Sequence, residues 1–192
     1  MTTATTPVPV APGDPSTLRR LHVARFGFAV VWALLLVAVG SHLSLLTAVL
    51  LVLYPLVDVA AAAVDARSSR AAAPETRSAV GLRATMTISA LAAIGLAVAL
   101  SSGVPAVPPV LRVWGVWAVV AGIVQLVVAI RRRSLGGQGA MIASGSISVL
   151  AGVAFVLMAS AAGGSLAGLA GYALLGGVFF LVSALRVGRA PR

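Results

Sequence analysis

The chain has 192 residues, of which 60% are hydrophobic and only 9% charged, and its formal net charge is +10. This composition leaves no water-soluble domain of useful size and indicates an integral membrane protein. The absence of cysteine excludes disulfides, thiolate metal sites and cysteine nucleophiles. The positive charge does not indicate nucleic-acid binding, because the arginines flank apolar segments, where topology and attraction to anionic lipid headgroups account for them.

Arginine clusters divide the chain into three apolar intervals, 26–66, 84–130 and 134–185. Each interval holds about 40 to 50 residues, whereas one membrane-spanning helix needs roughly 20. Each interval therefore predicts a helical hairpin. The three hairpins together predict an all-α, polytopic membrane bundle of six transmembrane helices. The clusters are Arg19, Arg20 and Arg25; Arg67, Arg70, Arg77 and Arg83; Arg131, Arg132 and Arg133; and Arg186, Arg189 and Arg192. Because short loops retain arginine on the cytoplasmic side, we expect both termini in the cytoplasm.

The hairpins form a single domain over 21–187, between two cytoplasmic tails. Residues 1–20 are rich in proline and threonine, and such a composition buries too little apolar area to offset the entropy of ordering. We therefore expect a disordered tail there and a second short tail over 188–192. The use of arginine without lysine, with abundant alanine and valine, indicates codon bias in a GC-rich bacterial genome.

The first two helices are expected at about 24–40 and 43–64. Gly40-Ser41-His42 predicts a tight external turn between them. A long internal loop over 65–80 follows, with Pro74 as a helix breaker.

The second hairpin is expected at about 81–101 and 109–130, and the third at about 140–160 and 165–187. Pro109 suits a first helical turn, because its missing N–H would have no partner there.

Aromatic residues mark a weak internal repeat among the even-numbered helices. Each is followed by a basic residue thirteen or fourteen positions on, and the later two by a glycine five positions on. These aromatic positions are Tyr54, Trp117 and Tyr172. The odd-numbered helices give a fainter match, which pairs Ser89 with Ser146 and Gly95 with Gly152. Three hairpins inserted in the same sense predict parallel repeats about an axis along the membrane normal.

Short glycine-containing runs in the last two hairpins resemble the repeats of the HdeD-type acid-resistance membrane proteins. The runs are WAVVAGI at 117–123 and YALLGGV at 172–178, with Gly145 and LAGV at 150–153 before the second. The likeness covers most of residues 22–187, and the first hairpin departs most because it lacks the corresponding glycines. The resemblance implies a six-helix bacterial inner-membrane protein associated with survival in acid, and it carries over no catalytic or ligand-binding residue.

Asp58 is the sharpest candidate for chemistry inside the membrane. It lies about six residues, or roughly 9 Å, from the expected inner end of its helix. An ionisable group at that depth is costly unless it is paired or neutral. Arg25 or Arg83, in the first turns of their helices, could reach Asp58 or Asp65 and form a salt bridge between helices. The alternatives are a proton-accepting carboxylate and a partly hydrated group with neither role.

Three further polar residues have two interpretations each. We expect Arg112 to extend to the external headgroups, with an anion site as the alternative. Gln125 predicts a hydrogen bond between helices or, alternatively, a substrate contact. His42, on the external side, would charge as the outside acidifies and is a candidate pH-responsive residue, or else a solvated turn histidine.

Proline and small residues indicate where helices bend or pack closely. Pro55 removes the hydrogen bond to the carbonyl of Leu51 and allows a kink. Two small-residue patterns allow close helix contact, as seams within the bundle or as dimer faces. They are Ser144, Ser148 and Gly152 at four-residue spacing, and the GxxxG of Gly164 and Gly168 at the head of the sixth helix.

The sequence favours a membrane protein without catalytic function. It shows no metal-ligand spacing, no serine-histidine-aspartate set and no phosphate loop, so we expect no enzyme and no cofactor. One function is the contribution to acid or envelope stress tolerance that the resemblance implies. The alternative is a small secondary transporter or proton-linked carrier that uses Asp58. The expected partners are the lipid bilayer and its anionic headgroups, and a homo-oligomer or a membrane-protein partner stays open.

Overall fold

A computed structural model describes residues 15–72, 77–101, 107–131, 139–160 and 164–186, with the side chains of 15–18, 68–72 and 77–80 excepted. These ranges contain helices and turns but no strand. The helices are α1 (Pro15–Val39), α2 (Leu45–Ala72), α3 (Arg77–Ser101), α4 (Val107–Arg131), α5 (Gly139–Met158) and α6 (Ala167–Arg186). All six are long and apolar enough to cross a membrane. The predicted all-α bundle of six membrane-spanning helices is confirmed.

Several helices extend beyond their predicted ends. Helix α1 begins at Pro15, so residues 15–20, which we expected in the disordered tail, are helical. The loop expected over 65–80 is much shorter, because α2 continues to Ala72 and α3 begins at Arg77. The predictions ended each helix where the apolar residues end, but alanine and arginine are strong helix formers and prolong helices beyond that point. The rest of the predicted tails, 1–14 and 188–192, lies outside the described residues.

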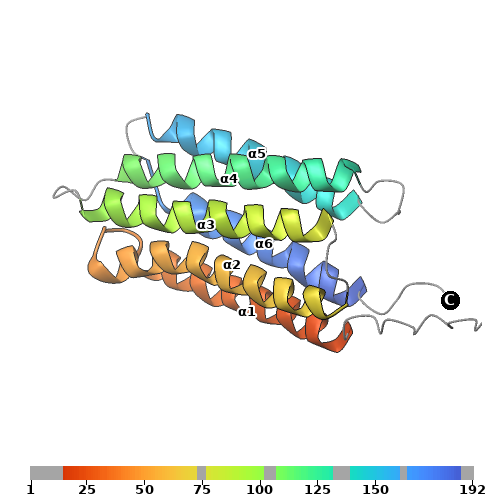
Figure 1. Ribbon diagram of the computed structural model, residues 1–192. Coiled ribbons are helices and arrows are strands. Elements are labelled where there is room, and N and C mark those ends of the chain that lie inside the picture. The colour runs from red at the N-terminus through yellow and green to blue at the C-terminus, as the bar shows by residue number, and fades with distance from the viewer. Residues whose placement is uncertain (1–14, 73–76, 102–106, 132–138, 161–163, 187–192) are drawn as a thin grey trace, which may run out of the picture.

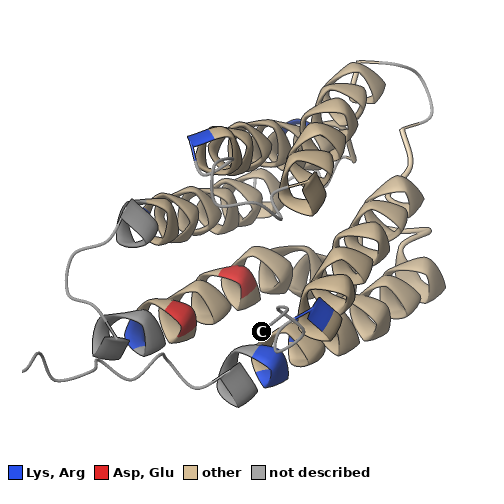
Figure 2. Cartoon of the chain, turned by 90° about the vertical axis from the view of Figure 1, so that its right-hand side faces the viewer, with Lys and Arg blue, Asp and Glu red and all other residues tan. Residues whose placement is uncertain are grey.

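Successive helices run in opposite directions (Figure 1), so all the described arginines except Arg112 lie toward one end of the bundle. Figure 2 views this arginine-rich end, which carries Arg19, Arg20, Arg67, Arg83, Arg131 and Arg186. His42 and Arg112 lie toward the opposite end. Arg132 and Arg133 lie outside the described residues.

The helices form a closed ring in which the tightest neighbours come from different hairpins. Helix α4 packs most extensively on α5, followed by α1 on α6 and α2 on α3, with α3 on α4 next. The hairpin partners α1 and α2, and α5 and α6, touch least. Each predicted hairpin is therefore present in chain order, but its main contacts are with the next hairpin around the ring.

Burial and hydrogen bonds support the predicted repeat and correct one of its matches. The residue three positions before each repeat aromatic is fully buried: Leu51, Trp114 and Leu169. Trp117 Nε1 donates to Ser89 Oγ at 3.1 Å, and Tyr172 Oη donates to Ser148 Oγ at 3.1 Å, so the aromatics of the second and third hairpins each reach a serine on the other helix of the hairpin. Ser148, and not Ser146, thus corresponds to Ser89. Small residues alone did not reveal this register, because they recur on several faces of α5.

Glycines bring the backbones of α4 and α5 into direct contact. A Cβ on Gly152 would lie 2.5 Å from the carbonyl oxygen of Gly115, and a Cβ on Gly122 would lie 2.7 Å from that of Gly145. Glycine is therefore required at these positions for the observed approach. The seam includes two members of the predicted pattern, Gly152 and Ser148, whose Cβ lies 3.0 Å from the place of a Gly122 Cβ.

The predicted GxxxG pattern is not a helix motif, because α6 begins only at Ala167. Gly164 precedes the helix, and a Cβ there would lie 3.0 Å from Leu111 of α4. A Cβ on Gly168 would lie 3.2 Å from Phe155 of α5. Both glycines thus pack within the bundle.

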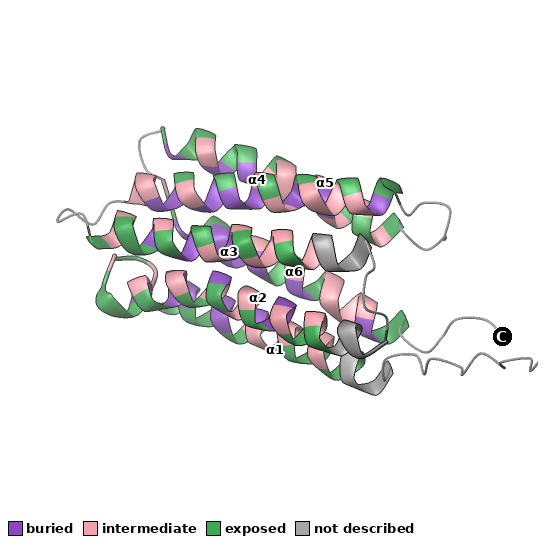
Figure 3. Cartoon of the chain, in the orientation of Figure 1, coloured by how far each residue is buried: buried purple, intermediate pink, exposed green. Residues whose placement is uncertain are grey.

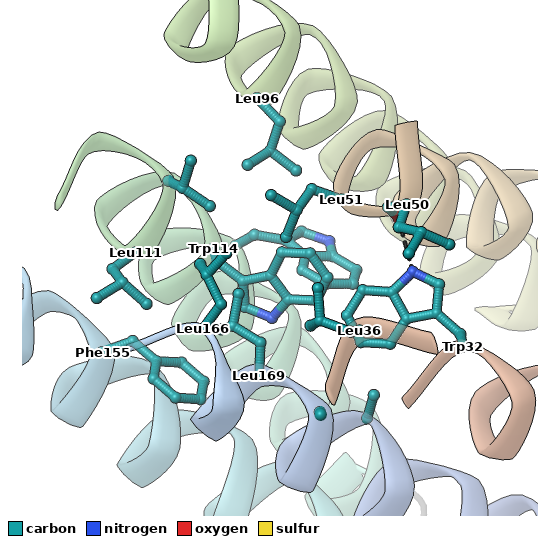
Figure 4. Packing of buried hydrophobic residues seen from close by; sticks show 14 of the residues in the cluster. Trp32, Leu36, Leu50, Leu51, Leu96, Leu111, Trp114, Phe155, Leu166 and Leu169 are labelled. Atoms are coloured by element: carbon teal, nitrogen blue, oxygen red, sulfur yellow. Dashed lines mark hydrogen bonds between the residues drawn. The ribbon is translucent and has the colours of Figure 1, made fainter. Parts of the chain in front are cut away.

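Aromatic side chains fill the centre of the ring (Figure 4). Trp32 of α1 stacks on Trp114 of α4 at 5.4 Å between ring centroids, and Tyr54 of α2 packs edge-on against Trp32 at 4.7 Å. Trp32 Nε1 donates to the carbonyl oxygen of Leu50 at 2.6 Å, one residue before the carbonyl that Pro55 frees. Helix α2 continues through Pro55. Large side chains thus replace close backbone contact on this side of the ring.

Apolar side chains also cover the outer surface. Figure 3 shows buried residues where helices face one another and exposed residues on the outer sides. Leucines on the outside are 62% to 70% exposed, namely Leu34, Leu91, Leu150 and Leu157. Such a surface is stable in lipid and would aggregate in water. The chain is therefore a multi-pass integral membrane protein.

The turn between α1 and α2 depends on Thr47, which is fully buried. Its hydroxyl lies 3.1 Å from the Val39 carbonyl oxygen and 2.9 Å from that of His42, and its backbone N–H donates to the capping Ser44 Oγ at 3.2 Å.

We expect Thr47→Val to lower the free energy of unfolding by about 1 kcal/mol, because the isosteric side chain cannot donate a hydrogen bond. Thermal unfolding in detergent micelles measures this. Thr87→Val on the exposed side of α3 is the matched control, and an equal loss in both variants would contradict the role of Thr47.

Candidate functional site: a polar network inside the bundle

Asp58 of α2 forms an ion pair with Arg25 of α1. Arg25 Nη2 donates to Asp58 Oδ1, and the two side chains are only 21% and 14% exposed. Asp58 follows Pro55 by one helical turn and lies nine residues before Arg67, where the candidate membrane span ends. At 1.5 Å per residue this is about 13 Å, deeper than we predicted because the helix is longer.

The second carboxylate oxygen of Asp58 is also occupied. Ser89 Oγ of α3 donates to Asp58 Oδ2 at 2.7 Å, and Trp117 Nε1 of α4 donates to Ser89 Oγ at 3.1 Å. Ser89 is 1% exposed, so its hydroxyl has exchanged water for these two partners. We call Arg25, Asp58, Ser89 and Trp117 the polar network. It joins four helices in one chain of contacts.

A fifth helix joins through Phe180 of α6. The Arg25 guanidinium carbon lies 3.9 Å from the Phe180 ring centroid, a cation–π contact typical of arginine. The His22 ring lies near the same phenyl group, at 6.0 Å between centroids. The guanidinium is thus held between a carboxylate on α2 and an aromatic face on α6.

The geometry of the polar network favours structural pairing over proton transfer. A guanidinium and a hydroxyl both donate hydrogen bonds to the carboxylate of Asp58, so neither of its oxygens is left without a partner. The hydrogen-bond chain ends at Trp117, because an indole only donates, and its rings pack against Trp114 at 5.3 Å and Tyr54 at 6.0 Å. Within the described residues, no further hydrogen bond of Trp117 continues this chain toward the opposite end of the bundle.

The other predicted site residues are not brought to the network. Arg83 is exposed on α3, and Asp65 is half-buried near the end of the α2 span. Of the two arginines considered for Asp58, only Arg25 contacts it. Arg112 is exposed near the opposite end, and His42 is exposed in the turn between α1 and α2.

The hydrogen bond predicted for Gln125 is not found. Gln125 is half-buried on α4, and no hydrogen bond links it to another side chain or backbone group in the described part of the chain. The same described ranges contain no group of three or more histidine, aspartate or glutamate side chains that could hold a metal ion.

Three members of the site were not recognised as such from the sequence: Ser89, Trp117 and Phe180. Ser89 and Trp117 were noted only as repeat markers. One available signal was depth, because Ser89 lies eight residues after Gly81, where the span of α3 begins, and Asp58 lies nine residues before Arg67, where the span of α2 ends. A polar residue at the depth of an intramembrane carboxylate is a candidate partner for it.

No family model, curated protein or solved structure matches this chain. The site is therefore interpreted from its own geometry, and the resemblance to the HdeD-type proteins rests on the glycine-containing runs of α4, α5 and α6.

Proposed function

We propose that this is an HdeD-like integral membrane protein that contributes, without catalysis, to tolerance of acid or envelope stress in a bacterial inner membrane. The observation that carries the proposal is the pairing of Asp58, whose two oxygens are occupied by Arg25 and Ser89. The most reactive group inside the bundle thus holds helices together. The six membrane-spanning helices are the number that the resemblance implies.

The charge distribution also supports a role under acid conditions. We propose that the arginine-rich end faces the cytoplasm, as expected for short loops. The opposite end, with His42 and Arg112, then faces outward, and no aspartate or glutamate lies there among the described residues. Protonation of paired carboxylates is the main route of acid denaturation. External acid would therefore find no described carboxylate to disrupt at this end.

Acid survival of a strain that lacks the protein tests this function. We expect lower survival than in the parent strain, with full rescue by the wild-type chain and by Asp65→Asn. Asp58→Asn should rescue only in proportion to the amount of folded protein in the membrane, because we assign Asp58 a structural role. Survival is scored by colony counts, and protein amount by an epitope tag. Unchanged survival of the deletion strain would remove the stress function.

A proton-linked carrier is the second candidate, because Asp58 is an incompletely buried carboxylate on a proline-containing helix. It predicts that Asp58→Asn reaches wild-type amounts in the membrane and still fails to rescue. Proteoliposomes that contain a pH-sensitive dye measure proton flux directly. Flux that depends on Asp58 would replace the structural proposal, whereas dye signals equal to those of empty vesicles would exclude the carrier.

A further inference from the structure

Large buried side chains are confined to one half of the bundle. When each membrane span is divided at its middle, every buried leucine, valine, phenylalanine and tryptophan among the described residues lies toward the opposite end, as do those labelled in Figure 4. The buried hydrophobic residues described in the arginine-rich half are alanines, namely Ala29, Ala61, Ala62, Ala129 and Ala184. Because alanine contributes a single side-chain carbon, it cannot fill the centre of a ring of helices to the density of a protein interior.

Gln125 of α4 points into this loosely packed half. The side of α4 that faces lipid is marked by exposed residues, namely Val116, Val120, Ile123 and Val127. The inner side is marked by Trp114 and Ala118, which are fully buried. Gln125 follows Ala118 by seven residues, or two helical turns, so it lies on the inner side. It is nevertheless only half-buried, so the exposed part of its side chain borders space inside the ring.

Asp58 of α2 borders the interior in the same way. It follows the fully buried Leu51 by two turns and lies on the other side of α2 from the exposed Leu53 and Leu56. Its side chain still keeps 14% exposure, and that of its partner Arg25 keeps 21%. Polar groups at membrane depth face the interior of a bundle or a water-filled cavity, and the exposure of these two indicates the second case.

Tyr54 crosses the ring at the inner limit of this space. Its aromatic ring packs against Trp32 of α1 at 4.7 Å and Trp117 of α4 at 6.0 Å between centroids. Its hydroxyl reaches α6, where a Cβ on Gly176 would meet only the Tyr54 hydroxyl oxygen, at 4.0 Å. Tyr54 is half-buried, and its hydroxyl makes no hydrogen bond within the part of the chain that the structure describes. Space therefore reaches the centre of the ring beside Gly176.

The groups with free hydrogen-bonding capacity at this space carry no net charge. Arg25 and Asp58 neutralise each other. The Gln125 amide has both donors and an acceptor, and the Tyr54 hydroxyl can also act as either. The rings of Tyr54 and Trp117 add a flat apolar surface. A mostly apolar wall with a few polar groups is typical of small-molecule sites.

We propose that the arginine-rich half of the bundle encloses a hydrated vestibule that binds a small uncharged molecule with an amide-like edge and an apolar face. The vestibule opens at the arginine-rich end and stops at the rings of Tyr54 and Trp117. The amide-like edge pairs with Gln125, and the apolar face lies on the rings. This inference does not depend on the proposed stress function.

Thiol labelling tests whether the vestibule holds water, and the absence of native cysteine makes the labelling specific. The chain is placed in lipid nanodiscs, which expose both of its ends, and is treated with a charged methanethiosulfonate reagent. Gln125→Cys should react at least about tenfold faster than Val127→Cys on the lipid side, because hydrocarbon excludes the charged reagent. Ala118→Cys, beyond the rings, should react as slowly as Val127→Cys. Equal rates for Gln125→Cys and Val127→Cys overturn the vestibule.

Protection from labelling tests the ligand class, with benzamide as the probe. The reporter is Ser144→Cys, which is half-buried one turn before Ser148, the partner of Tyr172 across the ring. It should also label rapidly, and it tests the vestibule if Gln125→Cys does not fold. Benzamide should slow its labelling, whereas toluene, which lacks the amide, should not. Adding Gln125→Met should abolish the protection. Absence of protection by benzamide, or protection that persists with Gln125→Met, overturns the assigned ligand class.

Discussion

Replacing Gly152 with alanine is expected to lower the free energy of unfolding by about 1 to 3 kcal/mol or more, the range for forcing extra atoms into a packed interior. The new Cβ would lie 2.5 Å from the Gly115 carbonyl oxygen and 2.7 Å from the Val119 backbone nitrogen. Both are backbone atoms, so α4 and α5 must separate to make room. Thermal unfolding in detergent micelles, followed by tryptophan fluorescence, measures the loss.

Gly171→Ala on α6 is the matched control, because a Cβ there meets nothing within 4 Å. Alanine is the better helix former, so this variant should be unchanged or slightly more stable. Gly115→Ala should behave like Gly152→Ala, since its Cβ would lie 2.6 Å from the Gly152 carbonyl oxygen. If Gly152→Ala and Gly171→Ala unfold alike, the α4–α5 seam does not depend on glycine.

Removing either partner of the Arg25–Asp58 ion pair is expected to destabilise the bundle, and removing both is expected to cost less than the sum of the two single losses. Asp58→Ala leaves the Arg25 charge unpaired inside the bundle, and Arg25→Ala leaves the carboxylate with Ser89 alone. Each single loss should be about 1 to 3 kcal/mol, below the 3 to 5 kcal/mol typical of full burial because both groups keep some access to solvent. Arg25→Ala should cost more, since it also removes the contact with Phe180.

A double-mutant cycle isolates the pairing itself. The doubly substituted chain should lose clearly less stability than the sum of the two single losses. Asp65→Asn is the control on the same helix, and we expect a change within about 0.5 kcal/mol. Losses that simply add would show that the two side chains act independently and that the ion pair is not a structural link.

The arrangement of the helices along the chain could be read from the sequence because the cost of moving arginine through hydrocarbon is large and acts at every loop. From the arginine clusters we predicted six membrane spans, the opposite directions of successive helices and the end of the bundle at which most arginines gather. Helix ends were less accurate at Pro15 and Ala72, because a helix does not stop where its apolar stretch stops. Which helices neighbour each other was not readable, since lipid-facing and partner-facing residues are both apolar.

The candidate site was predictable only as far as its charges. Asp58 lies alone among apolar residues of its helix in the sequence, which predicts a charged partner, and Arg25 was one of two arginines considered for that role. Ser89 and Trp117 complete the network through the packing of α3 and α4, which depends on long-range contacts. Gln125 shows the limit of such reasoning, because its polarity predicted a hydrogen bond between helices that is not found among the described residues.

The position of the three tryptophans gives the unlabelled protein its own optical signal. Trp32 belongs to α1, whereas Trp114 and Trp117 belong to α4, and the rings of Trp32 and Trp114 are stacked. Stacked indoles couple electronically, and that coupling weakens steeply as they separate. Near-ultraviolet circular dichroism of the purified, unlabelled chain would thus register any departure of α1 from the centre.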